Sequence, residues 1–405
     1  MVSHGSKWTL ANVRVFDGSH LTEPTDVSVE DAVISGIGAR NDKATEVVDG
    51  GGAALLPGLI DAHTHADEQT LRQALTFGVT TEFDLLSMPD VMIPLRATVA
   101  TSLDLADVRS ASFGLTTPEG HPHQLRVGLN DPVWPTVSHP DQAQGFVDGR
   151  IAEGADYIKI LIEEGQAFGT SLPTITPELV AATVRAGHER GKMVLVHALT
   201  AAAAQIALDA GADGLTHLFI DRPHTEELIA RIVDSGMFVI PTLSTLAAIT
   251  GERDGANLAN DSRVRAKLTS DWVDNLSRSR DYQDSGQFQY ALHTVAALHA
   301  AGVDLLAGTD AAHLGASGLA HGASLHDELR LLVLAGLSPT AALNAATSVP
   351  AARFGLGDRG SIRPGARADL ILVDGDPTEK IGHTLSLLGV WREGVRLDPA
   401  AVNPT

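Results

Sequence analysis

Two histidines one residue apart are the first side chains in this sequence whose type and spacing could do chemistry. His63 and His65 close the segment Leu55-Leu-Pro-Gly-Leu-Ile-Asp-Ala-His-Thr-His65, which has the character of an extended chain. Side chains at positions i and i+2 of a strand point to the same face, so both imidazoles can bind one ion. Imidazole is a common ligand of zinc and other first-row divalent ions. The pair therefore predicts a metal site.

Further candidate ligands follow at the ends of other apolar runs. His197 and His217 each end such a run and can hold a second ion, and Asp310 ends another run with a carboxylate. Two neighbouring ions need a bridging anion, whereas a free lysine is a cation. Lys159, which lies inside a further run, can bridge only after reacting with carbon dioxide to form a carbamate.

Lys159 and Asp310 also have simpler interpretations. Asp310 could cap the N-terminus of a helix, a position at which aspartate is favoured, although the preceding Gly-Thr favours a ligand. Lys159 could be a solvated lysine at a strand edge. However, it is flanked by Ile158 and Ile160, and a buried ammonium tends to lose its proton. The neutral amine is the form that captures carbon dioxide, so we expect a carbamate here.

The elements that must position these residues are apolar, strand-length runs that alternate with helix-length amphipathic segments. Eight such βα repeats predict an α/β fold with a parallel sheet closed into a (β/α)8 TIM barrel. The carboxyl ends of the barrel strands meet on one face, where catalytic residues lie. The runs are 54–60, 80–83, 110–113, 157–162, 193–196, 214–217, 237–241 and 303–307.

Both ends of the chain differ from this middle, because they contain short alternating runs and turn signals such as Asp17-Gly18. We expect a small β-sandwich domain from residues 1–57 plus 356–405 and a barrel from 58–355. Helices are predicted from their caps at 177–190, 201–210 and 225–235. A long excursion at 244–299 is expected to add helices beside the active-site face.

Composition narrows the function classes. The 405 residues include 29 basic and 50 acidic side chains, a formal net charge of −21, which argues against binding to nucleic acid or an anionic membrane. There are no cysteines, so neither disulfides nor thiolate ligands contribute. No signal peptide or membrane-length apolar run is apparent. We expect a cytoplasmic protein with a small-molecule substrate, and homo-oligomer formation stays open.

Taken together, these motifs resemble the amidohydrolase superfamily, in its two-metal branch with a carboxylated lysine. The likeness extends over nearly the whole chain and is closest to imidazolonepropionase-like and Xaa-Pro dipeptidase-like members. In order, the motifs are Pro57-Gly-Leu-Ile-Asp-Ala-His-Thr-His65, Gly154-Ala-Asp-Tyr-Ile-Lys-Ile160, Val196-His-Ala198, Leu215-Thr-His217, Ala307-Gly-Thr-Asp-Ala311 and Gly360-Ser-Ile-Arg-Pro-Gly365.

The resemblance implies roles for these residues. One ion would be held by His63, His65 and Asp310, and the other by His197 and His217. Carboxylated Lys159 and a hydroxide would bridge the ions, with Asp310 passing a proton to the leaving group; Lys159 and Asp310 are thus the implied catalytic pair. Zinc is the first expectation for both ions, with manganese, cobalt or iron(II) as alternatives.

Substrate contacts are less defined by the sequence. His121 and His123 lie in a Gly/Pro-rich loop on the expected active-site side, although a plain surface loop is an equal alternative. Glu164 follows the lysine run, and His313 follows Asp310. Leu199 stands where many peptidase members carry a tyrosine, which speaks against a simple dipeptide and for an apolar acyl group or a cyclic amide. Arg109 and Arg222 are candidates for binding a substrate carboxylate.

The leading hypothesis is therefore hydrolysis of a C–N bond in an amide, N-acyl amino acid, dipeptide or cyclic amide. Hydrolysis of an ester, lactone or carbamate by the same site is the alternative, because both reactions pass through a tetrahedral intermediate. A non-catalytic metal-binding protein is the third hypothesis, and the complete ligand set argues against it.

Overall fold

The computed structural model describes residues 7–38, 44–126, 134–252, 254–279, 286–315 and 318–398. The strands are β1 Lys7–Val15, β2 Thr25–Glu30, β3 Val33–Ile37, β4 Glu46–Asp49, β5 Ala54–Pro57, β6 Leu59–Thr64, β7 Val79–Asp84, β8 Asp107–Ser110, β9 Ile158–Ile162, β10 Val194–Ala198, β11 Gly214–Thr216, β12 Phe238–Ile240, β13 Leu370–Val373, β14 Leu387–Arg392 and β15 Val395–Arg396. The α-helices are α1 Glu68–Thr76, α2 Pro89–Val99, α3 Ala143–Ala152, α4 Pro177–His188, α5 Ala201–Ala210, α6 Glu226–Ser235, α7 Leu243–Ile249, α8 Asp254–Asn260, α9 Ser262–Arg265, α10 Ser270–Leu276, α11 Phe288–Ala300, α12 Ala323–Leu334, α13 Pro339–Ala345 and α14 Ser348–Arg353.

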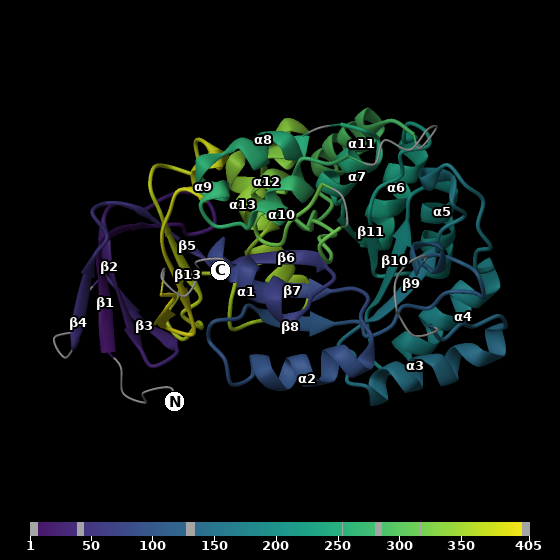
Figure 1. Cartoon of the computed structure of the whole chain (residues 1–405), viewed down its shortest axis with the longest axis horizontal. Coiled ribbons are helices and arrows are strands. Elements are labelled where there is room, and N and C mark those ends of the chain that lie inside the picture. Colours follow the sequence, from purple (N-terminus) through teal and green to yellow (C-terminus); the bar gives the residue numbers. More distant parts are fainter. Residues whose placement is uncertain are drawn as a thin grey trace.

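Strands from both ends of the chain share one sheet, in the order β15-β14-β13-β5-β1-β2-β3 with β4 also paired to β1. Figure 1 shows this sheet at one end of the molecule, beside the helix-rich remainder. The buried rings of Trp8 and Trp391 stack with centroids 5.7 Å apart and so join the two termini in one apolar core. The expected second layer of a β-sandwich, and the exact domain boundaries, stay predictions.

The middle of the chain forms two parallel sheets, β6-β7-β8 and β12-β11-β10-β9. Their regular ladders do not close into one ring. Single bridges lie at the seams, where Leu115 pairs with Ile160 on one side, and Val239 pairs with Leu305 and Thr64 with Ala311 on the other. The arrangement is therefore barrel-like, with its regular strand pairing interrupted at two places.

Three of the predicted runs need correction. The first run, 54–60, is two strands, since Ala54–Pro57 pairs within the terminal sheet and Leu59–Thr64 begins the barrel. Gly58 lies between them, and a Cβ there would approach the Thr80 side chain to 2.3 Å, so only glycine allows this passage. The third strand is Asp107–Ser110 rather than 110–113, because Ser112 has a φ of 55°. The eighth run, 303–307, contributes the bridge of Leu305 but no described strand.

The predicted helices are confirmed to within two residues. Helix α4 spans Pro177–His188 with a Thr176 cap, α5 spans Ala201–Ala210 with a Thr200 cap, and α6 begins at Glu226 because Thr225 is its cap. The 244–299 excursion contains α8, α9, α10 and α11 and most of α7. In the described residues, no helix combines the length and apolar character needed to cross a membrane.

Candidate metal centre and active site

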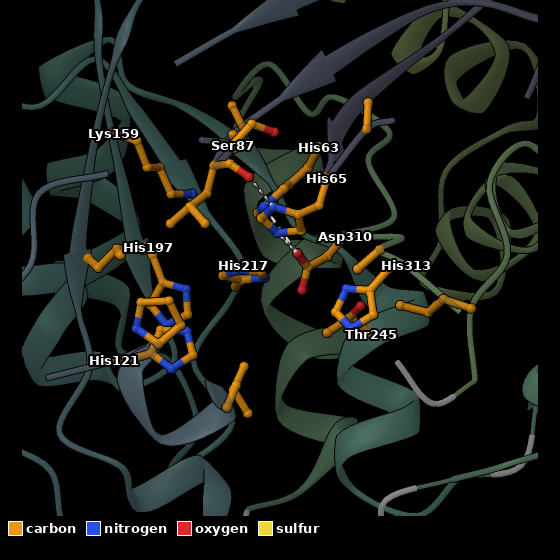
Figure 2. A pocket seen from close by; sticks show the side chains of 18 of the residues that line it. His63, His65, Ser87, His121, Lys159, His197, His217, Thr245, Asp310 and His313 are labelled. Carbon is orange, nitrogen blue, oxygen red and sulfur yellow. Dashed lines mark hydrogen bonds and ion pairs between the residues drawn. The ribbon is translucent and has the colours of Figure 1, made fainter. Parts of the chain in front are cut away.

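The six predicted metal ligands meet at one cavity of about 470 Å³. Figure 2 shows Lys159 and His197 entering from one side, and His63, His65 and Asp310 from the other, with His217 between them. These residues lie in or directly after β6, β9, β10, β11 and the segment that follows the Leu305 bridge. The structure thus places together residues that are up to 247 positions apart in the chain.

The Asp310 carboxylate lies against both histidines of the opening motif. Its Oδ1 atom is 3.2 Å from His63 Nε2 and 3.0 Å from His65 Nε2. Metal–ligand bonds of roughly 2.0–2.2 Å separate neighbouring ligand atoms by about 3.0–3.5 Å, so these distances suit a shared ion. Asp310 has a φ of 61° and its amide donates to the His63 carbonyl at 2.7 Å. This turn holds the carboxylate close to β6.

His217 connects this group to the second predicted pair. Its ring centroid is 4.8 Å from that of His63 and 4.6 Å from that of His197. His63, His217 and Asp310 each offer one ligand atom, and these three atoms lie within 4.8 Å of one another. His217 has a φ of 68°, and such backbone strain in non-glycine residues is concentrated at functional sites.

Three of the four histidines are held in orientation by a hydrogen bond at one ring nitrogen. His65 Nδ1 donates to the Leu86 carbonyl at 3.0 Å, and His217 Nδ1 is bonded to the Thr242 hydroxyl at 2.7 Å. His197 Nε2 donates to the buried Glu163 carboxylate at 3.1 Å. Metal-binding histidines are oriented in this way by a partner at the second nitrogen, so the arrangement fits metal ligation.

The protonation states also fit a metal site. Burial lowers the pKa of His63 and His217 well below the usual value, with Lys159 and neighbouring histidines acting in the same direction. Burial lowers the pKa of His197 to about 3. Neutral imidazole is the form that binds metals. His63 is 1% exposed, and its Nδ1 atom has no hydrogen-bond partner in the described residues.

Burial alone would lower the pKa of His65, but contact with Asp310 raises it above its usual value. The carboxylate thus favours a positive charge at this nitrogen. A proton or a metal ion between the two atoms would provide that charge. The donor set accordingly fits a cation at the position where His63, His65 and Asp310 meet.

Lys159 is 2% exposed and lies on β9 beside the histidine-bearing strand β10. Its ammonium is hydrogen-bonded to the Thr216 hydroxyl. Burial lowers the pKa of Lys159 to about 7, although Asp310 acts in the opposite direction. A substantial neutral fraction at physiological pH is what carbamate formation requires, so the environment suits the predicted modification.

Several supporting residues were not identified from the sequence. Asp61, fully buried on β6, accepts from the Thr309 amide at 3.0 Å, the Thr309 hydroxyl at 2.7 Å and the His63 amide at 3.2 Å. It thereby ties β6 to the turn that carries Asp310. Its position inside the Leu-Ile-Asp-Ala-His motif was the available signal. Glu163, which holds His197, stood out in the sequence only as an acidic residue after the lysine run that could contact a substrate. Thr242, which holds His217, gave no signal.

The structure separates the predicted substrate contacts into two groups. His121, Leu199 and His313 line the cavity, and the His121 ring stacks on His197 with centroids 5.0 Å apart. His123 and Glu164 do not line it: His123 Nδ1 is bonded to the Gly120 carbonyl, and Glu164 accepts from Thr200. Contact of any of the five with a substrate stays a prediction.

Comparison with known proteins agrees with the fold and with the resemblance found in the motifs. An imidazolonepropionase of Deinococcus deserti is 28% identical over 407 residues, covering 91% of both chains. An adenine deaminase of Methanoregula boonei is 25% identical over 91% of this chain, which spans only 55% of that protein. The crystal structure of a Xaa-Pro dipeptidase with bound methionine superposes with a TM-score of 0.76 at 23% identity, covering 97% of this chain and 100% of the other.

A model of the amidohydrolase family matches residues 150–397, which is more than half of the chain. The protein therefore belongs to the amidohydrolase family, and the resemblance predicted from its motifs is confirmed. The structural likeness shows a TIM-barrel-like fold.

Proposed function

We propose that the protein is a metal-dependent hydrolase that cleaves a C–N bond next to a carbonyl or an equivalent carbon. One observation carries this proposal: two histidine pairs, a buried lysine and a carboxylate, drawn from separate segments of the chain, meet at one cavity. The relatives support the choice of bond, because a deaminase, an imidazolonepropionase and a dipeptidase all act on C–N bonds.

In this proposal His63, His65 and Asp310 hold one divalent ion, and His197 and His217 hold the other. Lys159, as its carbamate, supplies the bridging anion. Nitrogen and oxygen ligands of this kind suit zinc first, and manganese, cobalt or iron(II) as alternatives. The ligand distances and the protein partners of His65, His197 and His217 support this assignment.

When bound, such ions would supply a Lewis acid and lower the pKa of water toward neutrality. The protein's own groups then have separate tasks. Asp310 takes a proton from the attacking water and returns it to the leaving nitrogen. The apolar side chains around the cavity exclude bulk water, which strengthens electrostatic interactions inside it. Esters, lactones and carbamates share the same tetrahedral geometry and remain the second candidate class.

The remaining expectations belong to the same proposal. The substrate is a small molecule, and the protein binds neither nucleic acid nor membrane and works in the cytoplasm, with homo-oligomer formation open. A non-catalytic metal-binding role is the remote alternative. Turnover by the metal-loaded protein separates the two, since both would hold metal and only the hydrolase would cleave a substrate.

Lys159→Ala is the decisive variant. We expect it to lose metal and to lower kcat/KM by about 100-fold or more, because several kcal/mol of transition-state stabilisation depend on the ions. Short carboxylic acids should restore part of the activity by replacing the carbamate. Lys192→Ala is the matched control, since the Lys192 ammonium donates to the Ala155 carbonyl and does not line the cavity. Full metal content and activity in Lys159→Ala would overturn the proposal.

A further inference from the structure

Beyond the candidate ligands and two further histidines, His121 and His313, the walls of the cavity are mostly apolar. They come from separate parts of the fold, including the β7–α2 connection, β9 and helix α7. The apolar lining residues are Ala66, Leu85, Leu86, Met88, Val91, Pro122, Leu125, Trp134, Leu161, Phe168, Leu199, Ala248, Ile249, Ala312 and Leu319. A substrate in a cavity of about 470 Å³ would therefore have apolar surface on several sides of the candidate metal ligands.

Beyond its histidines, the described lining offers no cationic side chain that is free to pair with a substrate carboxylate. It contains no arginine, and Lys159 is its only lysine, which the proposed function uses as the bridging carbamate. Residues 127–133 and 316–317 lie outside the described residues, and their sequence contains no lysine, arginine or histidine.

The two lining hydroxyls are already engaged as donors. Ser87 Oγ donates to Asp84 at 2.5 Å, and Thr245 Oγ1 donates to the Thr309 carbonyl at 2.8 Å. Each proton is thus committed to the protein, so neither hydroxyl is a free donor for an anion.

The two arginines predicted to bind a substrate carboxylate lie elsewhere. Arg109 lines a separate hollow formed with Arg96, Asp107 and Arg392. Arg222 pairs with its neighbour Asp221 at 2.7 Å, and its side chain is 66% exposed. The prediction that Arg109 or Arg222 binds a substrate carboxylate is therefore not supported. Strand order alone does not show which side of the barrel a side chain faces.

We propose that the cavity selects uncharged substrates, in which the scissile carbonyl carries an apolar aryl or alkyl group on each side. N-substituted amides, carbamates and ureas fit this description, whereas free dipeptides and N-acyl amino acids do not. This inference rests on the proposed function for the reaction itself, but it concerns the walls of the cavity.

The physical basis is the cost of burying a charge without a partner. A carboxylate moved from water into an apolar pocket loses its hydration, and the penalty amounts to several kcal/mol unless a cation compensates it. The net charge of −21 adds a repulsive field that disfavours anions during approach. Asp67, a further acidic lining residue, is engaged as the cap of α1 through the Thr70 amide.

A matched pair of substrates tests the inference. N-benzoyl-leucine and N-benzoyl-3-methylbutylamine share the same amide and the same alkyl group and differ only in the carboxylate. With the metal-loaded wild-type enzyme we expect kcat/KM to be about 100-fold higher for the neutral member. Binding of both compounds should be measured by calorimetry as well, so that selection is observed even if turnover is slow.

Met88 provides a variant that should reverse the preference. It is a half-buried lining residue that precedes α2 with extended backbone and no capping hydrogen bond, so substitution is compatible with the local structure. Met88→Arg should improve the relative kcat/KM of the carboxylate member about 10-fold or more, because it adds the missing cation. Met88→Gln, with similar length and no charge, should leave the preference unchanged.

The outcomes separate the two proposals. A wild-type preference for N-benzoyl-leucine, in binding or in turnover, would overturn the inference while leaving the hydrolase assignment intact. Binding of the neutral member with no hydrolysis of any amide, carbamate or urea tested would support the cavity argument and count against the proposed function. An unchanged preference in Met88→Arg would show that charge at the cavity wall does not determine selection.

Discussion

Glu163→Gln is the most informative change in the support of the candidate metal centre. The Glu163 side chain is fully buried, accepts from the Gly165 amide at 2.6 Å and lies 3.1 Å from His197 Nε2. Burial raises the pKa of Glu163, so its carboxylate needs a nearby positive charge to remain ionised. A divalent ion on His197 would provide that charge. Glu163 therefore acts as a positioning residue for one of the two proposed ions.

The size of the effect follows from the kind of bond that is lost. Glutamine has the same shape and can still accept from Gly165, so folding should be preserved. With its single oxygen on Gly165, the glutamine presents its NH2 group to the His197 Nε2–H donor, so the charge-assisted hydrogen bond to His197 is lost, at a cost of about 1–2 kcal/mol. That difference corresponds to about 5–30-fold in affinity, and partners of metal-binding histidines typically contribute 10–100-fold.

The assay is metal binding by chelator competition, with the two ions resolved. Glu163→Gln should weaken the ion held by His197 and His217 and spare the ion held by His63, His65 and Asp310. At limiting free metal, the content should therefore fall from about two ions per chain toward one. A uniform loss of both ions would instead indicate a general structural effect.

Glu164→Gln is the matched control, because it makes the same chemical change one residue away. Glu164 accepts from the Thr200 hydroxyl at 2.6 Å and does not line the cavity. It should keep wild-type affinity for both ions. Equal and unchanged affinities in the two variants would refute the positioning role of Glu163.

Two further predictions concern stability away from the metal centre. Burial lowers the pKa of His326 from its ordinary value of 6.5 to about 4, so the folded state keeps the ring neutral. Its stabilising contribution is present above pH 6.5 and is lost as the pH falls toward 4, by about 3 kcal/mol. Urea unfolding of wild type and His326→Gln across this range should show the difference shrinking at low pH, and a pH-independent difference would contradict the linkage. Glu328 accepts from the amides of Leu243 and Ser244 and from the Ser244 hydroxyl; Glu328→Gln should lower the free energy of unfolding by about 1–3 kcal/mol, and an unchanged urea midpoint would count against that role.

The convergence of the candidate ligands could be predicted because it depends on short-range rules. Side chains at i and i+2 of a strand share a face, and parallel strands present their carboxyl ends on one side of a barrel. His63 and His65 satisfy the first rule, and His197 and His217 the second. The helices were predictable for a similar reason, because Thr176 and Thr200 accept hydrogen bonds from the helices they precede.

The errors arose where tertiary contacts decide the local structure. An apolar run such as 54–60 can continue or divide, and only the approach of Thr80 to Gly58 shows that the chain passes from one sheet to another there. Likewise, the run at 303–307 has the composition of a strand but forms only the single bridge between Leu305 and Val239. Sequence periodicity does not distinguish these cases, since all have the same apolar character.

The candidate metal ligands and the wall residues of the cavity differ in how well they can be predicted from the sequence. Each candidate ligand belongs to a short motif in a defined strand register, so one sequence is enough to identify it. The walls are assembled from Met88, Trp134, Ile249 and Leu319, which belong to connections and helices with no shared motif. None of these four side chains carries a charge, and the apolar wall that they form becomes apparent only when the fold brings them together. The convergence of the candidate ligands is therefore predictable from short motifs, whereas the proposed preference for uncharged substrates requires the folded cavity.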